Sequence, residues 1–116
     1  MSFYFLYHLK LTKPYESPDH WTEKDNQTIS DHAQFFRELG EQGKLLFAGR
    51  TTYNPGHPSL FGIALIKAES QEAAEQMMAP DPAVVHGIQQ SEVHPFGVAI
   101  DFFENWQDWQ AEIEGI

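Results

Sequence analysis

Two segments of the chain carry large apolar residues at both odd and even positions, and this constrains the fold more than any other feature. Residues 2–11 alternate between two largely apolar sets, and residues 59–67 do the same. Successive side chains of a strand point to opposite faces of a sheet. A sheet with one face in water would alternate apolar and polar residues. We therefore predict a sheet that is covered on both faces.

The remaining segments predict two helices and two further strands. Thr22 and Asp25 have capping-box spacing, which starts a helix near Thr22, and Gly43 follows its end at about Gln42. A second helix begins at Ser70 and ends before Pro80. The other predicted strands cover residues 44–49 and 90–100, and the proline in the last one predicts an edge strand or a bulge.

The resulting order, β-α-β-β-α-β, is typical of an α+β, ferredoxin-like fold, with a four-stranded antiparallel sheet and both helices on one face. Two helices cover one face only, so we expect a second copy of the chain on the other face, as a homodimer. Residues 1–100 form this domain. Residues 101–116 predict an amphipathic helix that packs on its own subunit or its mate, or else forms a second oligomer interface or covers a pocket.

Composition excludes several classes of function. Seventeen acidic and seven basic residues give a formal net charge of -10 at pH 7, which disfavours nucleic acids and membrane surfaces as partners. The chain has no cysteine, so disulfides and zinc–thiolate sites are excluded. It has no glycine-rich phosphate loop, and its histidines lack metal-site spacing. We predict a cytoplasmic protein without cofactor or metal.

His32 is the first candidate for a functional residue. It lies with Ile29, Phe36 and Leu39 on one face of the predicted helix, where the other three side chains are hydrocarbon. A buried imidazole needs a hydrogen-bond partner or a cavity. An imidazole exchanges protons near neutral pH, so a general acid–base role is one interpretation. The alternative is a core histidine that a backbone carbonyl satisfies.

Several short motifs occur in a distinctive order along residues 1–100. They are Tyr7–Lys10, Asp31-His32, Phe36, Leu39, Gly43-Lys44-Leu45, Ala48-Gly49-Arg50, Glu72-Ala73-Ala74, Asp81-Pro82, Gly87, Val93 and His94-Pro95-Phe96. This combination resembles the YciI-like (YCII-related) proteins of the dimeric α+β-barrel group. The resemblance implies a ferredoxin-fold homodimer with a site centred on a histidine and an aspartate. One relative is associated with dehydrochlorination of an aromatic ring, whereas most have no assigned reaction.

The resemblance and the residues together give five candidate site residues. His32 and Asp81 form a predicted acid–base pair in which the carboxylate orients the imidazole; alternatively, Asp81 only caps the next helical turn. Arg50 can bind a carboxylate or phenolate through both guanidinium nitrogens, or can pair with a surface acid. His94 and Tyr7 line the same cavity, or simply fill the sheet.

These residues leave three functions open. The first is a cofactor-independent lyase or isomerase that acts on a small, aromatic or other, organic acid. The second is a cofactor-free monooxygenase on the same barrel, and the third is a ligand-binding or regulatory module without catalysis. Fold alone does not distinguish them. In each case the expected partners are a small molecule and a second copy of the chain.

Overall fold

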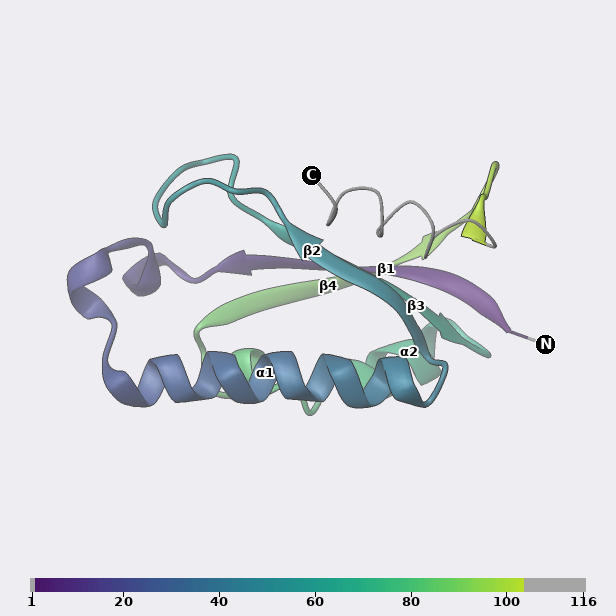
Figure 1. Ribbon diagram of the computed structural model, residues 1–116, viewed down its shortest axis with the longest axis horizontal. Helices are drawn as coiled ribbons and strands as arrows, with labels where there is room; N and C mark the ends of the chain where they lie inside the picture. The colour runs from purple at the N-terminus through teal and green to yellow at the C-terminus, as the bar shows by residue number, and fades with distance from the viewer. Residues whose placement is uncertain (1, 104–116) are drawn as a thin grey trace, which may run out of the picture.

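The computed structural model describes residues 2–103 and has the predicted order of elements (Figure 1). Two short 3-10 turns, η1 and η2, precede the first long helix, and a one-turn helix, α3, precedes the last strand. The elements are β1 (Phe3–Leu11), η1 (Lys13–Glu16), η2 (Pro18–His20), α1 (Glu23–Glu41), β2 (Leu45–Arg50), β3 (Gly62–Ala68), α2 (Gln71–Met78), α3 (Pro82–Val85) and β4 (Gln89–Phe96).

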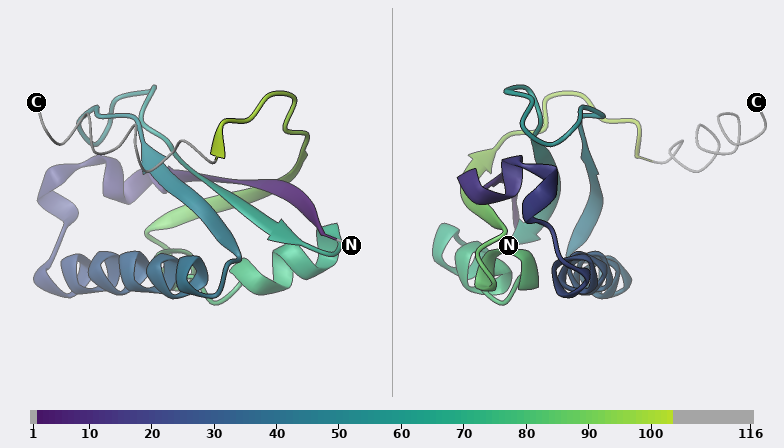
Figure 2. Two further views of the ribbon diagram at one scale, coloured as in Figure 1. Left: turned by 45° about the vertical axis from the view of Figure 1, so that its right-hand side comes forward. Right: turned by 90° about the vertical axis from the view of Figure 1, so that its left-hand side faces the viewer.

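The four strands form one antiparallel sheet in the order β2-β3-β1-β4. The central strand β1 pairs with β3 on one side and with β4 on the other. Helices α1 and α2 lie on the same face of this sheet, as Figures 1 and 2 both show. The predicted α+β, ferredoxin-like fold is confirmed.

Local sequence signals set the limits of α1. Thr22 is the N-cap, and the Thr22 hydroxyl and the Asp25 carboxylate each accept a hydrogen bond from the other residue's backbone N–H, which completes the predicted capping box. After the helix, Gly43 has a φ of 75°, a left-handed conformation that glycine adopts without a steric penalty. The chain then turns directly into β2.

The start of β3 and the end of β4 differ from the predicted boundaries by several residues, and the other strand ends by at most one. β3 begins at Gly62 rather than at Ser59, because the Thr51 hydroxyl donates to the Ser59 carbonyl and accepts from the Phe61 N–H in place of a regular ladder. β4 ends at Phe96, opposite Tyr4 near the start of β1, so no strand remains to pair with residues beyond it. β2 extends to Arg50. Pro95 lies in β4, which is an edge strand as predicted.

The hydrophobic core lies between the sheet and the helices. Tyr7 and Ile66 are fully buried on the helix-facing side, where Leu39 of α1 and Met78 of α2 contact the sheet. On the opposite face lie Leu6, His8, Ile63 and Leu65, which we call the open face. No helix among residues 2–103 packs on the open face. The helix predicted in the tail lies outside the described residues, apart from residues 101–103.

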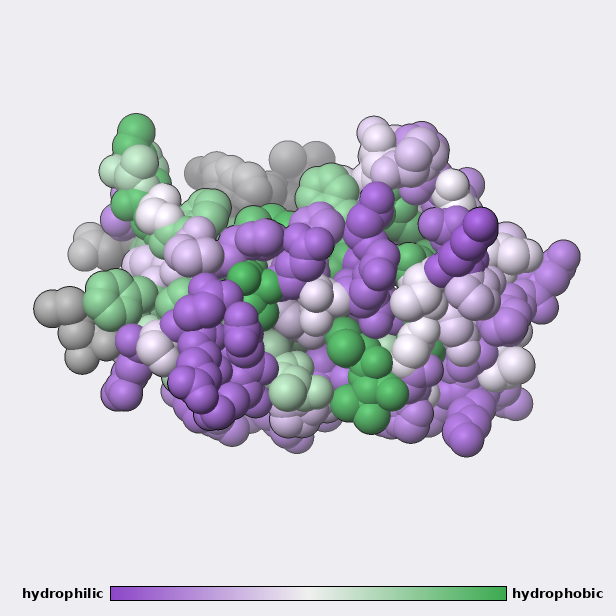
Figure 3. All heavy atoms as spheres, turned by 180° about the vertical axis from the view of Figure 1, so that it is seen from behind, coloured by the Kyte–Doolittle hydropathy of each residue, from purple (hydrophilic) through white to green (hydrophobic). Residues whose placement is uncertain are grey.

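On the side of the molecule seen in Figure 3, hydrophilic residues predominate, and hydrophobic ones form small separate groups. Among residues 2–103, none of the helices combines the length and the apolar character that crossing a bilayer requires.

Candidate functional site

Asp81 is a fully buried carboxylate that accepts three hydrogen bonds. The Tyr7 hydroxyl donates to Oδ2 at 2.8 Å, and the Ala83 N–H donates to Oδ1 at 3.1 Å. The third donor is His32, whose Nδ1 lies 2.5 Å from Oδ1. Asp81 reaches this position because it is the N-cap of α3, with Pro82 in the first turn. The turn that the sequence predicted therefore carries a carboxylate into the core.

The geometry of His32 follows from this contact. The side chain comes from the core-facing side of α1, and 13% of its surface is exposed. Its ring packs against Phe36 with 4.4 Å between the ring centroids. Because the carboxylate can only accept, Nδ1 carries the proton and Nε2 of the neutral ring is an acceptor. Asp81 thus fixes both the orientation and the tautomer of His32, with Nε2 on the side away from Asp81.

Tyr7 is the third member of this group, and its hydroxyl stays protonated. Burial, and then the negative charge of Asp81, raise the pKa of the Tyr7 hydroxyl. A protonated hydroxyl can donate to Asp81, whereas a phenolate could not. Tyr7 is 1% exposed and forms the inner side of the site.

This raised pKa predicts how Tyr7 affects stability at alkaline pH. Above about pH 10 the unfolded chain loses the hydroxyl proton while the folded chain keeps it. The free energy of unfolding of the wild type should therefore fall by up to about 1.4 kcal/mol per pH unit from this residue alone. Tyr7→Phe lacks this term, so its stability deficit at neutral pH should shrink as pH rises. Urea unfolding of both proteins across this range measures the difference, and a constant difference would contradict the prediction.

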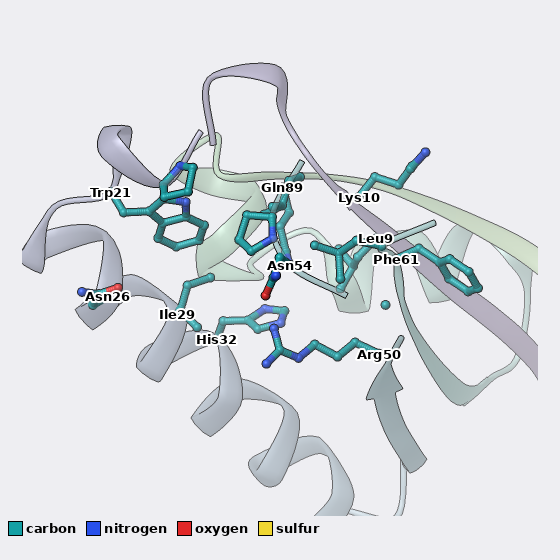
Figure 4. A pocket seen from close by; sticks show the side chains of 15 residues that line it. Leu9, Lys10, Trp21, Asn26, Ile29, His32, Arg50, Asn54, Phe61 and Gln89 are labelled. Carbon is teal, nitrogen blue, oxygen red and sulfur yellow. The ribbon is translucent and has the colours of Figure 1, made fainter. Parts of the chain in front are cut away.

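A cavity of about 710 Å³ lies beside His32 (Figure 4). It is bounded by the first half of α1 and by η2 with the following Trp21. The last residues of β1, the first residue of β4 and the loop between β2 and β3 form its other sides. The lining residues are Leu9, Lys10, Leu11, Pro18, Trp21, Asn26, Ile29, His32, Arg50, Asn54, Pro55, Leu60, Phe61, Gly62 and Gln89.

Among residues 2–103, the lysines and arginines that line this cavity are Lys10 and Arg50, and no aspartate or glutamate of that part of the chain lines it. In Figure 4 the Arg50 side chain extends from the end of β2 toward His32, whereas the Lys10 ammonium points away from the ring. A cavity with a guanidinium and no carboxylate in its wall favours an anionic ligand.

The structure brings four of the predicted residues to one site and places His94 elsewhere. His32 contacts Asp81, and His32 and Arg50 line the cavity. Tyr7 does not line it, because the hydroxyl lies behind Asp81. His94 lies opposite Leu6 on the open face, where its Nε2 lies 2.8 Å from a Glu92 carboxylate oxygen. The alternation of side chains along β4 keeps His94 out of this cavity.

Sequence reasoning did not find Trp21, Asn54 or Gln89. They come from the segment between η2 and α1, from the loop between β2 and β3 and from the first position of β4, and share no spacing in the sequence. The family resemblance did not include them either. Only the fold brings these three segments to one cavity.

The sequence profile of the YCII-related domain matches residues 8–97. The chain belongs to the YCII-related domain family. The matched region includes His32, Arg50 and Asp81 and all of the strands except the beginning of β1. No curated protein matches this YCII-related chain significantly in sequence.

Solved structures resemble this YCII-related protein in fold at low sequence identity. The 5-chloro-2-hydroxyhydroquinone dehydrochlorinase TftG from Burkholderia phenoliruptrix, solved with 2,5-dihydroxybenzoquinone, superposes with a TM-score of 0.53 at 17% identity. That match covers 81% of this chain and 93% of the other. SnoaB, a cofactor-independent oxygenase from Streptomyces nogalater, has a TM-score of 0.46 at 10% identity, over 87% of this chain and 96% of the other.

Proposed function

We propose that the protein is an acid–base enzyme of the lyase or isomerase type, which acts on a small organic anion with His32 as the proton acceptor. The observation that carries this proposal is the contact between His32 Nδ1 and the buried Asp81, beside a cavity that Arg50 and no carboxylate of residues 2–103 line. This arrangement leaves Nε2 as a base whose tautomer is fixed. It also supplies a cation for the substrate's negative charge.

The reaction begins with the binding of the anionic group by Arg50. Nε2 of His32 then takes a proton from an acidic C–H or O–H group of the substrate, and its bonding electrons remain on the substrate. The buried Asp81 carboxylate stabilises the imidazolium that forms. In an isomerase the proton returns to a different atom of the same molecule. In a lyase the electron pair expels an anionic leaving group, and the proton leaves with that group or with water.

Proton abstraction can be tested without knowledge of the natural substrate. In deuterium oxide, a base that removes a carbon-bound proton reversibly replaces it with deuterium, which NMR detects. Phenylpyruvate is a suitable first probe, because it is a small aromatic anion with acidic benzylic hydrogens. We expect exchange in phenylpyruvate, or in related aromatic 2-oxo acids, above the rate in buffer. If the protein binds these acids but deuterium exchange is no faster than in buffer, the protein is a binding module.

We also propose that a second copy of the chain covers the open face. Leu6 and Ile63 lie at its centre, and Phe61 and Phe96 at its ends remain 37% and 42% exposed. Large apolar side chains left exposed on one face of a sheet are typical of an interface between proteins. The absence of a helix on this face among residues 2–103 supports the same proposal.

If two copies associate through the open face, a single charged residue at the centre of this face should dissociate the dimer. We expect wild-type protein at micromolar concentration to have the mass of two chains in light scattering, and Ile63→Asp to have the mass of one. Val85→Asp is the matched control, because Val85 is 64% exposed on α3, on the helical side of the sheet. Circular dichroism establishes that both variants are folded. A monomeric wild type would exclude the homodimer.

A further inference from the structure

Three carboxamide side chains line the cavity and make no hydrogen bonds to the protein. They are Asn26 on α1, Asn54 in the loop between β2 and β3, and Gln89 at the start of β4. Within residues 2–103 no hydrogen bond engages any of these three side-chain amides, whereas Gln27, Gln34, Gln71 and Gln76 each donate to a neighbouring carboxylate. Gln42 and Gln90 also lack a side-chain hydrogen bond within these residues, but they do not line the cavity.

Gln89 is the least satisfied of the three. Its Oε1 atom is shielded from solvent and has no hydrogen-bond partner. A buried carbonyl oxygen without a partner is costly, and most such groups in native proteins are hydrogen-bonded. The side chain lies on the helix-facing side of β4, next to Leu11 and at the edge of the cavity.

Asn54 is held over the site by its loop. The Asn54 carbonyl accepts a backbone hydrogen bond from His57, and Thr51 closes the base of the loop. At the tip, Gly56 has a φ of 91°, and a Cβ there would lie 2.9 Å from the carbonyl oxygen of Glu16. The loop thus packs closely against η1. In Figure 4 the Asn54 amide points toward His32.

The rest of the wall is mostly apolar and includes the indole ring of Trp21, from the segment after η2. Phe61 also borders the cavity, but its ring points away from it and stacks on His8. Leu9, Ile29 and Leu60 lie between the polar groups. Such a wall accommodates a ring or a short hydrocarbon skeleton. With Arg50 on the anionic group, the amides remain for other ligand groups that donate or accept hydrogen bonds.

We infer that this cavity selects organic anions, aromatic carboxylates above all, that carry a hydroxyl or keto oxygen in addition to the anionic group. Asn54 and Gln89 are the residues that determine this specificity. The inference rests on the proposed function, since Arg50 binds the anionic group. It adds that a purely hydrocarbon acid is a poor ligand, because it leaves both amides without partners. A site built to hydrogen-bond a hydroxyl group discriminates strongly against the analogue that lacks it.

The test compares three carboxylates that have the same charge at neutral pH: benzoate, 3-hydroxybenzoate and 3,5-dihydroxybenzoate. Isothermal titration calorimetry measures the dissociation constant of each. We expect the wild type to bind at least one hydroxylated acid about tenfold more tightly than benzoate. In Asn54→Leu or Gln89→Leu this preference should disappear, while benzoate affinity stays within about twofold. Gln34→Leu is the matched control, because Gln34 is an exposed residue of α1 outside the cavity.

Each failure has its own signature. Equal affinity of the wild type for all three acids would overturn the inference and leave the anion site standing. Arg50→Gln should lower the affinity for all three acids by a similar factor. If this variant binds benzoate as tightly as the wild type does, the proposed anion site itself is wrong. If none of the three acids binds at millimolar concentration, the proposed class of substrate, aromatic carboxylates, is wrong. A preference for hydroxyl groups that survives in both leucine variants would show that other residues determine it.

Discussion

Asp81→Ala is expected to lower the free energy of unfolding by about 3–5 kcal/mol, because it removes the buried acceptor of three hydrogen bonds. The Tyr7 hydroxyl, which is fully buried, would keep its proton and have no acceptor at that position. The Ala83 N–H would lose its acceptor, which is the N-cap side chain of α3. His32 would lose its only charged partner among residues 2–103. The small alanine side chain also leaves a void in the core.

Urea unfolding at neutral pH measures this effect, and Tyr7→Phe provides the comparison. Phenylalanine keeps the ring and removes one donor, while Asp81 retains His32 and Ala83 as donors. Tyr7→Phe should lower the free energy of unfolding by a smaller amount, about 1.5–3 kcal/mol, which is typical of a hydrogen bond to a charged group. If Asp81→Ala costs no more than Tyr7→Phe, the three contacts do not stabilise the fold as described. A change in the slope of the urea transition would indicate a loss of two-state behaviour.

His32→Asn is expected to lower the rate of deuterium exchange into phenylpyruvate, or the best 2-oxo acid found, by about 10²- to 10⁴-fold, the usual contribution of a general base. Asparagine keeps a polar side chain of similar reach on α1 and can still hydrogen-bond to Asp81. It has no nitrogen that accepts a proton at neutral pH. The fold should therefore persist while the base is lost.

The control for this effect is His86→Asn, because His86 is an exposed histidine at the end of α3 and does not line the cavity. It should exchange at the wild-type rate. If His32→Asn exchanges as fast as His86→Asn does, His32 is not the base.

Asp81→Asn separates the charge of Asp81 from its hydrogen bond to His32. The Ala83 N–H needs an acceptor at the Oδ1 position, so the amide oxygen should stay there and still accept from His32 Nδ1. The His32 tautomer is then kept, while the negative charge and the acceptor for the Tyr7 hydroxyl are lost. We expect a smaller decrease in exchange than for His32→Asn.

The fold was predictable because its signals are local and repeated. The capping box at Thr22 and Asp25 and the positive φ of Gly43 each depend on a few neighbouring residues. The order of the elements then left few topologies, since strands joined by short connections pair in a limited number of ways. The strand ends were less predictable, because a side chain such as the Thr51 hydroxyl can replace a ladder hydrogen bond.

The candidate site was predictable only in part. His32 was identified because an imidazole interrupts an apolar helix face, and Asp81 because the family resemblance implied a partner for it. His94 was named for the same cavity, but the alternation of β4 places it on the open face. Asn54 and Gln89 gave no signal, because an isolated amide in a loop or at a strand end usually contacts water.

The sequence by itself thus determined the elements, their order, and the titratable residue on the core side of α1. These properties follow from periodicity and capping, which act between residues close in the chain. Only the tertiary structure decided that His32 meets a carboxylate 49 residues away. It also decided that three amides and Arg50 surround one cavity, because these contacts depend on how β1, α1 and the loop between β2 and β3 pack together.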